Sequence, residues 1–223
     1  MSGLDAPWPN WPPPKPSLSL VIPTAALTDQ TARGLSYAFR AYLLRNFVLP
    51  QAIASGAFRE ILVVGEFEAG TGYTYLPCSS VERSNVSDAI RKRHIGTRAA
   101  TGDWICVLND DHIFDPQFFT RFAVHAAVAD VVSPARWTRL RHADGEQLNG
   151  GEPGGRWSGA GHLNGHCCVF KRAVLECCPW HALPWTFTYD VVQTERIREA
   201  GFHIVWSPDV IVWDVEHGAT PWR

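Results

Sequence analysis

The sequence predicts an α/β fold in which a mostly parallel sheet is covered by helices on both faces. Its 223 residues, 46% of them hydrophobic and 19% charged, have the composition of one globular domain. Uniformly apolar runs such as residues 18–22 and 104–108 are typical of strands that are buried on both faces. These runs alternate with segments of helical periodicity through about the first 130 residues, as strands and crossover helices do in parallel sheets.

In the first half of the chain, strands and helices are indicated by apolar patterns and by the residues that bound them. We expect strands over residues 18–22, 61–64, 73–76 and 104–108, and helices from residue 35 to Pro50, from Asn85 to Gly102 and from Asp115 onward. Pro50 is expected to end the first of these helices, because proline disfavours the interior of a helix. At the start of the second, Asp88 follows Asn85 in the manner of a capping box. Asp115 and Pro116 have the preferred order of a helix cap and a first-turn proline.

The second half of the chain is less regular. We expect strands over residues 131–133, 137–140, 167–170, 202–206 and 210–213, and helices over residues 172–178 and 189–200. Residues 144–165 form a glycine-rich stretch, and a loop of that length in a compact domain is usually a functional flap or disordered. Residues 1–16 contain six prolines and two tryptophans, which predicts an extended arm ahead of a single domain over residues 17–223.

Charge, hydropathy and cysteine spacing exclude several classes of protein. The net charge of −2 provides no general attraction to nucleic acid or anionic lipid. Apolar runs fall short of the ~18–20 residues that a membrane span requires, and no signal-peptide pattern follows Met1. We therefore expect a cytoplasmic protein with no membrane span and no nucleic-acid partner. The six cysteines lack the CxxC spacing of a zinc site, and without a secretory signal we expect buried, reduced thiols and not disulfides.

The most specific chemical feature is the run Asn109-Asp110-Asp111-His112 directly after the strand at residues 104–108. Two adjacent carboxylates without a basic neighbour repel each other and favour a cation between them or nearby, although the same residues are also common in turns. Ligands of open α/β sheets bind outside the carboxyl ends of strands. Thr24 and Glu66 follow two other predicted strands, so we expect them to line one crevice with the acidic run.

Several segments, in this order along the chain, resemble the family 2 glycosyltransferases. They are residues 20–24, 61–66, 93–105, 107–111, 189–202 and 209–217. Residues 107–111 stand where that family keeps its DxD motif, and residues 93–105 resemble its RNxG…AxGxyI passage from helix to strand. The sequence departs from the family pattern at three places. Asn109 replaces the first aspartate of DxD, Tyr189 replaces the glutamate that usually precedes Asp190, and Gly65-Glu66 replaces paired aspartates.

The resemblance covers roughly residues 17–217 and implies the GT-A (Rossmann-like) fold, with the irregular second half on the acceptor side. It implies Mn²⁺ (or Mg²⁺) as cofactor, because a divalent ion bridging the donor's diphosphate neutralises the leaving group. Asp111 and His217 are the implied metal ligands, and Asp190 is the implied base for an acceptor hydroxyl. The implied contacts to the nucleotide sugar are Pro23, Thr24, Glu66, Arg93, Asn109 and Asp110. The resemblance also places Gly165-His166 beside the donor sugar.

Three of these residues also have simpler interpretations. His217 could be an exposed histidine near the end of the chain, and Asp190 could be a plain N-cap of the helix that it opens. Arg93 could be one solvated charge in the basic run at residues 91–93.

The function predicted from the sequence is inverting, metal-dependent transfer of a sugar from a nucleotide-diphosphate sugar, with a UDP-sugar favoured, to a hydroxyl of a glycan or other acceptor. One alternative is a sugar-phosphate nucleotidyltransferase, which usually needs a glycine-rich basic loop where this chain has Pro23-Thr24-Ala25-Ala26. Another is a non-catalytic module that binds nucleotide sugars or glycans, which Asn109 and Tyr189 suggest.

Overall fold

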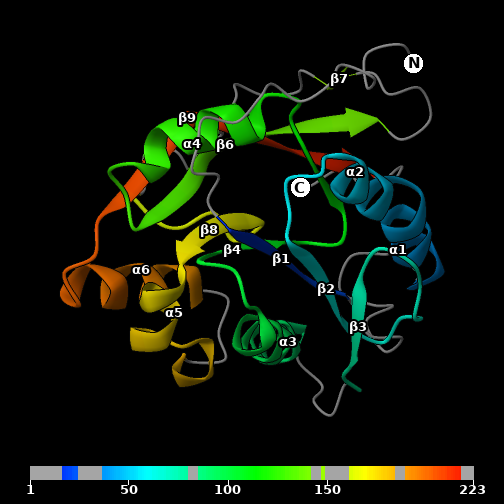
Figure 1. Ribbon diagram of the computed structural model, residues 1–223, viewed down its shortest axis with the longest axis horizontal. Coiled ribbons are helices and arrows are strands. Elements are labelled where there is room, and N and C mark those ends of the chain that lie inside the picture. The colour runs from blue at the N-terminus through cyan, green and yellow to red at the C-terminus, as the bar shows by residue number, and fades with distance from the viewer. Residues whose placement is uncertain are drawn as a thin grey trace.

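One sheet lies at the centre of the computed structural model, with helices on both of its faces (Figure 1). The structure describes residues 17–24, 37–79, 85–141, 147–148, 161–183 and 189–216. The predicted arm over residues 1–16, most of the glycine-rich stretch and His217 lie outside these residues. Among the described residues, nine strands join the sheet in the spatial order β3 (Thr74–Pro77), β2 (Glu60–Gly65), β1 (Leu18–Pro23), β4 (Trp104–Leu108), β8 (Cys167–Lys171), β6 (Val131–Arg141), β9 (Ile204–Glu216) and β5 (His112–Phe114), with β7 (Gln147–Leu148) paired to β6.

The two faces of the sheet are covered by different helices. These are α1 (Tyr37–Leu43), α2 (Leu49–Ala54) and α4 (Phe118–Ala126) on one face, and α3 (Asn85–Ala99), α5 (Arg172–Cys177) and α6 (Tyr189–Glu199) on the other (Figure 1). The central strand β1 contributes to both layers, because Leu20 packs in the cluster that contains Phe118 of α4 and Val21 packs in the cluster that contains Ile90 of α3. This explains why β1 is apolar at both odd and even positions.

The first half of the sheet is parallel, as the sequence predicted. β1 pairs in parallel with β2 and with β4, and β2 pairs in parallel with β3. Helix α3 lies very close to β1 and β2 at Gly96, where an added Cβ would stand 2.3 Å from Val21 Cγ1 and 2.9 Å from Val64 Cγ2. The lack of a side chain at Gly96 therefore sets the distance between helix and sheet.

The helix predicted to end at Pro50 instead continues to Ala54. Between α1 and α2, residues Leu44–Val48 form a π-helical segment, and Pro50 lies in the first turn of α2. Proline lacks the N–H that would bond the carbonyl four residues earlier, and its ring clashes with that carbonyl in a regular α-helix. The wider π-helical turn just before Pro50 accommodates both effects, so the helix is interrupted but not ended.

The second half of the sheet is mixed and differs in detail from the prediction. β8 is antiparallel to β4 and β6, whereas β9 is parallel to β6 and antiparallel to β5. The strands predicted over residues 131–133 and 137–140 form the single strand β6, with an irregularity between Pro134 and Arg136. Proline is tolerated in a sheet at such an irregularity, which explains why the strand continues past it. The two strands predicted over residues 202–213 are likewise one strand, β9.

Helix α4 begins later than Asp115 because Asp115 and Pro116 belong to the turn that precedes it. Asp115 Oδ1 accepts a hydrogen bond from Gln117 N at 2.9 Å, and the Asp115 carbonyl accepts one from Phe118 N at 2.9 Å. The three-residue strand β5, which the sequence analysis did not identify, lies between the acidic run and this turn.

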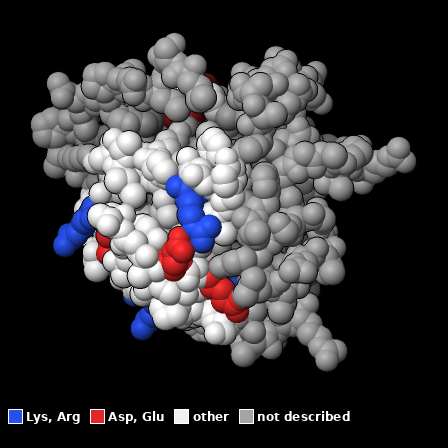
Figure 2. Space-filling view, turned by 90° about the vertical axis from the view of Figure 1, so that its right-hand side faces the viewer, with Lys and Arg blue, Asp and Glu red and all other residues white. Residues whose placement is uncertain are grey.

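All six cysteines are free thiols, and five of them are buried as predicted, whereas Cys177 is exposed. None of the helices within the described ranges is long and apolar enough to cross a membrane. Figure 2 shows the side of the molecule that carries α1, α2 and β3, and on its described part basic and acidic side chains lie near one another among uncharged residues.

Candidate active site

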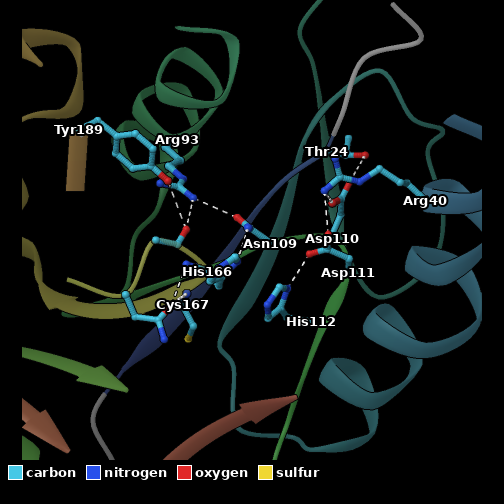
Figure 3. A network of polar contacts seen from close by, with 12 residues as sticks. Thr24, Arg40, Arg93, Asn109, Asp110, Asp111, His112, His166, Cys167 and Tyr189 are labelled. Carbon is cyan, nitrogen blue, oxygen red and sulfur yellow. Dashed lines mark hydrogen bonds and ion pairs between the residues drawn. The ribbon is translucent and has the colours of Figure 1, made fainter. Parts of the chain in front are cut away.

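The acidic run lies at the carboxyl end of β4, beside the carboxyl end of β1 (Figure 3). Thr24 follows β1 directly, and its hydroxyl donates a hydrogen bond to Asp110 Oδ2 at 3.1 Å. Asp110 and Asp111 are almost fully buried, with 1% and 3% of their surfaces exposed. The strand ends therefore bring Thr24 and the acidic pair together, as the topology rule predicted.

Both carboxylates of the acidic pair contact Arg40 of α1. The same nitrogen, Nη2, lies 2.7 Å from Asp110 Oδ1 and 3.0 Å from Asp111 Oδ2. The sequence analysis had inferred a cation between the carboxylates, but it did not identify Arg40. No local signal links a residue in α1 to a loop after β4.

Thr24 is held in place from several sides. Its amide donates to the Val64 carbonyl at 2.9 Å, and its own carbonyl accepts a hydrogen bond from Lys92 Nζ at 2.8 Å. Lys92, which is buried on α3, also pairs with Asp88 of the same helix. The main chain of Thr24 is therefore fixed by internal bonds, and its hydroxyl contacts the acidic run. Glu66 follows the neighbouring strand β2 and is half-buried there.

Arg93 on α3 is a buried clamp and not a solvated surface charge. Its Nη2 donates to Asn109 Oδ1 at 3.0 Å and to the Gly165 carbonyl at 2.6 Å (Figure 3). The guanidinium carbon also lies 5.4 Å from the ring centre of Trp180 and 4.9 Å from that of Tyr189. Arg93 therefore connects the loop after β4 to the segment before β8, and aromatic rings stabilise its charge.

His112, the last residue of the acidic run, is enclosed by acidic and aromatic neighbours. Its Nδ1 lies 2.5 Å from Asp111 Oδ1, and its ring stacks on that of His166 with the ring centres 4.6 Å apart. Burial acts to lower the pKa of His112, but the charge and hydrogen bond of Asp111, together with the charge of Asp214, outweigh burial and raise the pKa overall. His112 Nε2 is buried and has no hydrogen-bond partner among the described residues.

Asp111, His112 and Asp214 could together hold a metal ion. One potential ligand atom from each of these buried residues lies within 4.8 Å of the others. Asp214 reaches the site because β9 is antiparallel to β5, with Asp214 opposite His112. Two carboxylates and an imidazole suit a divalent ion such as Mn²⁺, and the unpartnered Nε2 of His112 is a further sign that the donor set is suited to a ligand.

The sequence analysis identified Asp111 of this cluster but named His217 as the other ligand. His217 lies outside the described residues, and its role stays a prediction. Asp214 was missed because nothing in the sequence gives the register between β5 and β9.

Asp190 lies in the first turn of α6 and is buried, with 7% of its surface exposed. Burial raises its pKa, although the hydrogen bond from Val191 N to Oδ1, at 2.9 Å, acts in the opposite direction. The start of a helix favours the ionised form of a carboxyl group, but here burial outweighs this effect. A Cβ added at Gly165 would lie 3.7 Å from Asp190 Oδ2, so Asp190 lies beside the segment that Arg93 clamps.

Comparison with protein families shows to which family the chain belongs. The family model described as glycosyltransferase-like family 2 matches residues 74–223, more than half of the sequence. The chain belongs to this family. The matched region begins at β3 and includes the acidic run, Asp190 and Asp214. No curated protein sequence matches the chain.

Solved structures show the same fold at low sequence identity. The chain is similar to GalNAc-T7 with UDP, GalNAc and Mn²⁺, with a TM-score of 0.60 and 11% identity over 92% of this chain and 45% of that one. It is also similar to the bifunctional IspDF from Campylobacter jejuni, with a TM-score of 0.52 and 14% identity over 86% of this chain and 49% of that one. The mannosyltransferase PcManGT from Pyrobaculum calidifontis, in complex with GDP-Man and Mn²⁺, matches with a TM-score of 0.48 and 16% identity over 95% of this chain and 61% of that one. The similarity to GalNAc-T7 shows that this glycosyltransferase-family chain has the GT-A fold predicted from its sequence. The chain spans 45% to 61% of the length of these proteins.

Proposed function

We propose that this chain transfers a sugar from a nucleotide-diphosphate sugar to a hydroxyl acceptor, with inversion and with the help of a divalent ion. One observation carries this proposal. The segment Gly165-His166, at the carboxyl end of β4, lies between two buried groups. On one side is the cluster of Asp111, His112 and Asp214, which could hold a metal ion, and on the other is the carboxylate of Asp190. Family membership supports it, as does the fold shared with GalNAc-T7, whose structure contains UDP, GalNAc and Mn²⁺.

In the proposed donor site, the chain offers ligands for both the metal ion and the nucleotide. Asp111 and Asp214 would hold the ion through carboxylate oxygens and His112 through a neutral ring nitrogen, a mixed set that favours Mn²⁺ over Mg²⁺. When bound, such an ion supplies Lewis-acid stabilisation of the departing diphosphate. His217 remains a proposed additional ligand.

The remaining donor contacts follow the strand ends. The hydroxyl of Thr24 and the carboxylate of Glu66 lie at the ends of β1 and β2, where they would contact the base and ribose of a UDP-sugar. Pro23, the last residue of β1, would form the wall beside them. Asn109 and Asp110 would contact the ribose or the donor sugar, while Arg93 would act by fixing Asn109.

At the acceptor end, Asp190 would accept the proton of the attacking hydroxyl. Burial raises its pKa, which makes it a stronger base than an exposed aspartate. Attack from the face opposite the diphosphate in one displacement inverts the anomeric carbon. The glycan or other hydroxyl acceptor would be selected by the glycine-rich stretch, which lies mostly outside the described residues.

A thermal-shift panel with UDP, GDP, dTDP and CMP, each with Mn²⁺ or with chelator, tests the donor half of this proposal. A ligand that binds only the native state adds about 2.7 kcal/mol at 100 times its dissociation constant. We expect a shift for one nucleotide, UDP, that disappears with chelator and in D111A. If no nucleotide shifts the melting temperature, or if D111A keeps a full Mn²⁺-dependent shift, the proposed donor site is wrong.

Turnover separates a transferase from a binding module. Release of the nucleotide from its sugar should require Mn²⁺ and an acceptor, and the anomeric configuration of the product reports inversion. Tight nucleotide-sugar binding without any release of nucleotide, in the presence of a broad set of sugar acceptors, would favour the binding module.

A further inference from the structure

Arg40 occupies the position between the two adjacent carboxylates of the acidic loop. Its Nη2 contacts both Asp110 Oδ1, at 2.7 Å, and Asp111 Oδ2, at 3.0 Å (Figure 3). The Arg40 side chain is 21% exposed, whereas the two carboxylate side chains are at most 4% exposed. A single positively charged nitrogen thus bridges the acidic pair from the solvent side of a buried site.

This contact competes with a metal ion for Asp111. One oxygen of Asp111 is held by Arg40, and the other lies against His112, so both are already engaged before a metal ion arrives. A divalent ion at Asp111 would also be repelled by the guanidinium, and this repulsion is strong where water is largely excluded. Arginine does not lose its proton in proteins, so the repulsion can be relieved only if the side chain moves.

We propose that Arg40 is an exchangeable counter-ion of the acidic pair, so that its contact with Asp111 and the binding of a divalent ion oppose each other. Without metal, the guanidinium neutralises the buried carboxylates and keeps the loop in its binding geometry. On metal binding, it moves away from Asp111 on its flexible stem. The freed guanidinium then binds the donor's diphosphate, for which its planar set of donors is suited. This last step rests on the proposed function, whereas the competition with metal does not.

Titration with Mn²⁺ alone, without nucleotide, tests the competition directly. R40Q should bind Mn²⁺ about 5- to 150-fold more tightly than the unmodified chain, the usual range for coupling between two binding events. R45Q is the matched control, because Arg45 loses the same charge nearby but pairs with the exposed Glu68. We expect R45Q to stay within about twofold of the unmodified chain. Equal or weaker Mn²⁺ binding by R40Q, or an equal gain in R45Q, would overturn the inference.

R40K separates loss of charge from a loosened site. Lysine keeps the positive charge, so R40K should bind Mn²⁺ with nearly the affinity of the unmodified chain. If R40K gains as much affinity as R40Q, or if R40Q does not fold and R40K gains affinity, the effect is one of packing and the inference fails.

UDP binding at saturating Mn²⁺ tests the diphosphate step. R40Q should bind UDP at least about tenfold more weakly although it binds Mn²⁺ more tightly, and a merely structural role would not produce this opposite pair of changes. If R40Q binds Mn²⁺ more tightly but binds UDP with unchanged affinity, Arg40 is a counter-ion of the acidic pair but does not bind the donor's diphosphate. If no nucleotide binds any variant, the proposed function fails while the Mn²⁺ comparison still decides the role of Arg40.

Discussion

The two halves of the sheet contribute to the candidate site in different ways. In the parallel half, β1 and β4 end side by side, and the residues directly after them, Thr24 and the acidic run, are brought together by the rule for strand ends. In the mixed half, the contributions depend on particular pairings. Asp214 faces His112 through the register of β9 against β5, and Asp190 lies on a helix beside the segment that precedes β8. Strand order therefore predicts the first kind of residue. Of the second kind, the family resemblance had implied Asp190, whereas only the folded structure reveals Asp214.

The largest effect is expected at Asp190, where the mixed half would supply the base. D190N should lower the rate of sugar transfer by about 100-fold or more, because the amide cannot accept the proton, while UDP binding is retained. Steady-state kinetics together with the UDP-induced thermal shift measure the two effects. E195Q, an exposed change on the same helix, is the control. Transfer close to the unmodified rate in D190N would assign the base to another group.

The pH dependence of kcat/KM sharpens this prediction. A base must be ionised, so activity should fall as the pH drops through the pKa of Asp190. Since burial raises that pKa above the ordinary aspartate value of 3.8, the acidic limb should lie at higher pH than it would for an exposed aspartate. In D190N this limb should be lost from the residual activity. An unchanged limb would show that it belongs to a different group.

The contrast between the halves also explains how far the sequence could predict the molecule. β1, apart from Ser19, and β4 are apolar because both of their faces are covered, so their ends, and the acidic run, could be located from the sequence. Strand β5 has three residues, too few to show a period, and Pro134 made β6 look like two strands. Arg40 could not be predicted, because an ion pair between α1 and the acidic run leaves no local pattern.

A further prediction tests whether Asp214, in the mixed half of the sheet, completes the metal site. D214N should weaken Mn²⁺ binding by about tenfold or more, because it removes one carboxylate of the cluster and keeps the size of the side chain. Calorimetric titration measures the affinity, and D209N, an exposed change on the same strand, is the control. The same titration on H217A tests the ligand predicted from the sequence. If D214N binds Mn²⁺ with unchanged affinity and H217A loses much of its affinity, the second ligand is His217 and not Asp214.

The last prediction concerns stability and not binding or activity, and it lies in the parallel half, at the close contact between α3 and the sheet. Helix propensity alone predicts that replacing the helical Gly96 with alanine would stabilise the chain by about 1 kcal/mol. The structure predicts the opposite sign, because the new Cβ would stand 2.3 Å from Val21 Cγ1 in a packed core. Over-packing of this kind costs about 1–3 kcal/mol, so G96A should lower the midpoint of urea unfolding. Because Arg93 and Lys92 lie on the same helix, a stabilised G96A would mean that α3 is not held this close to β1, and the placement of both residues in the donor site would have to be revised.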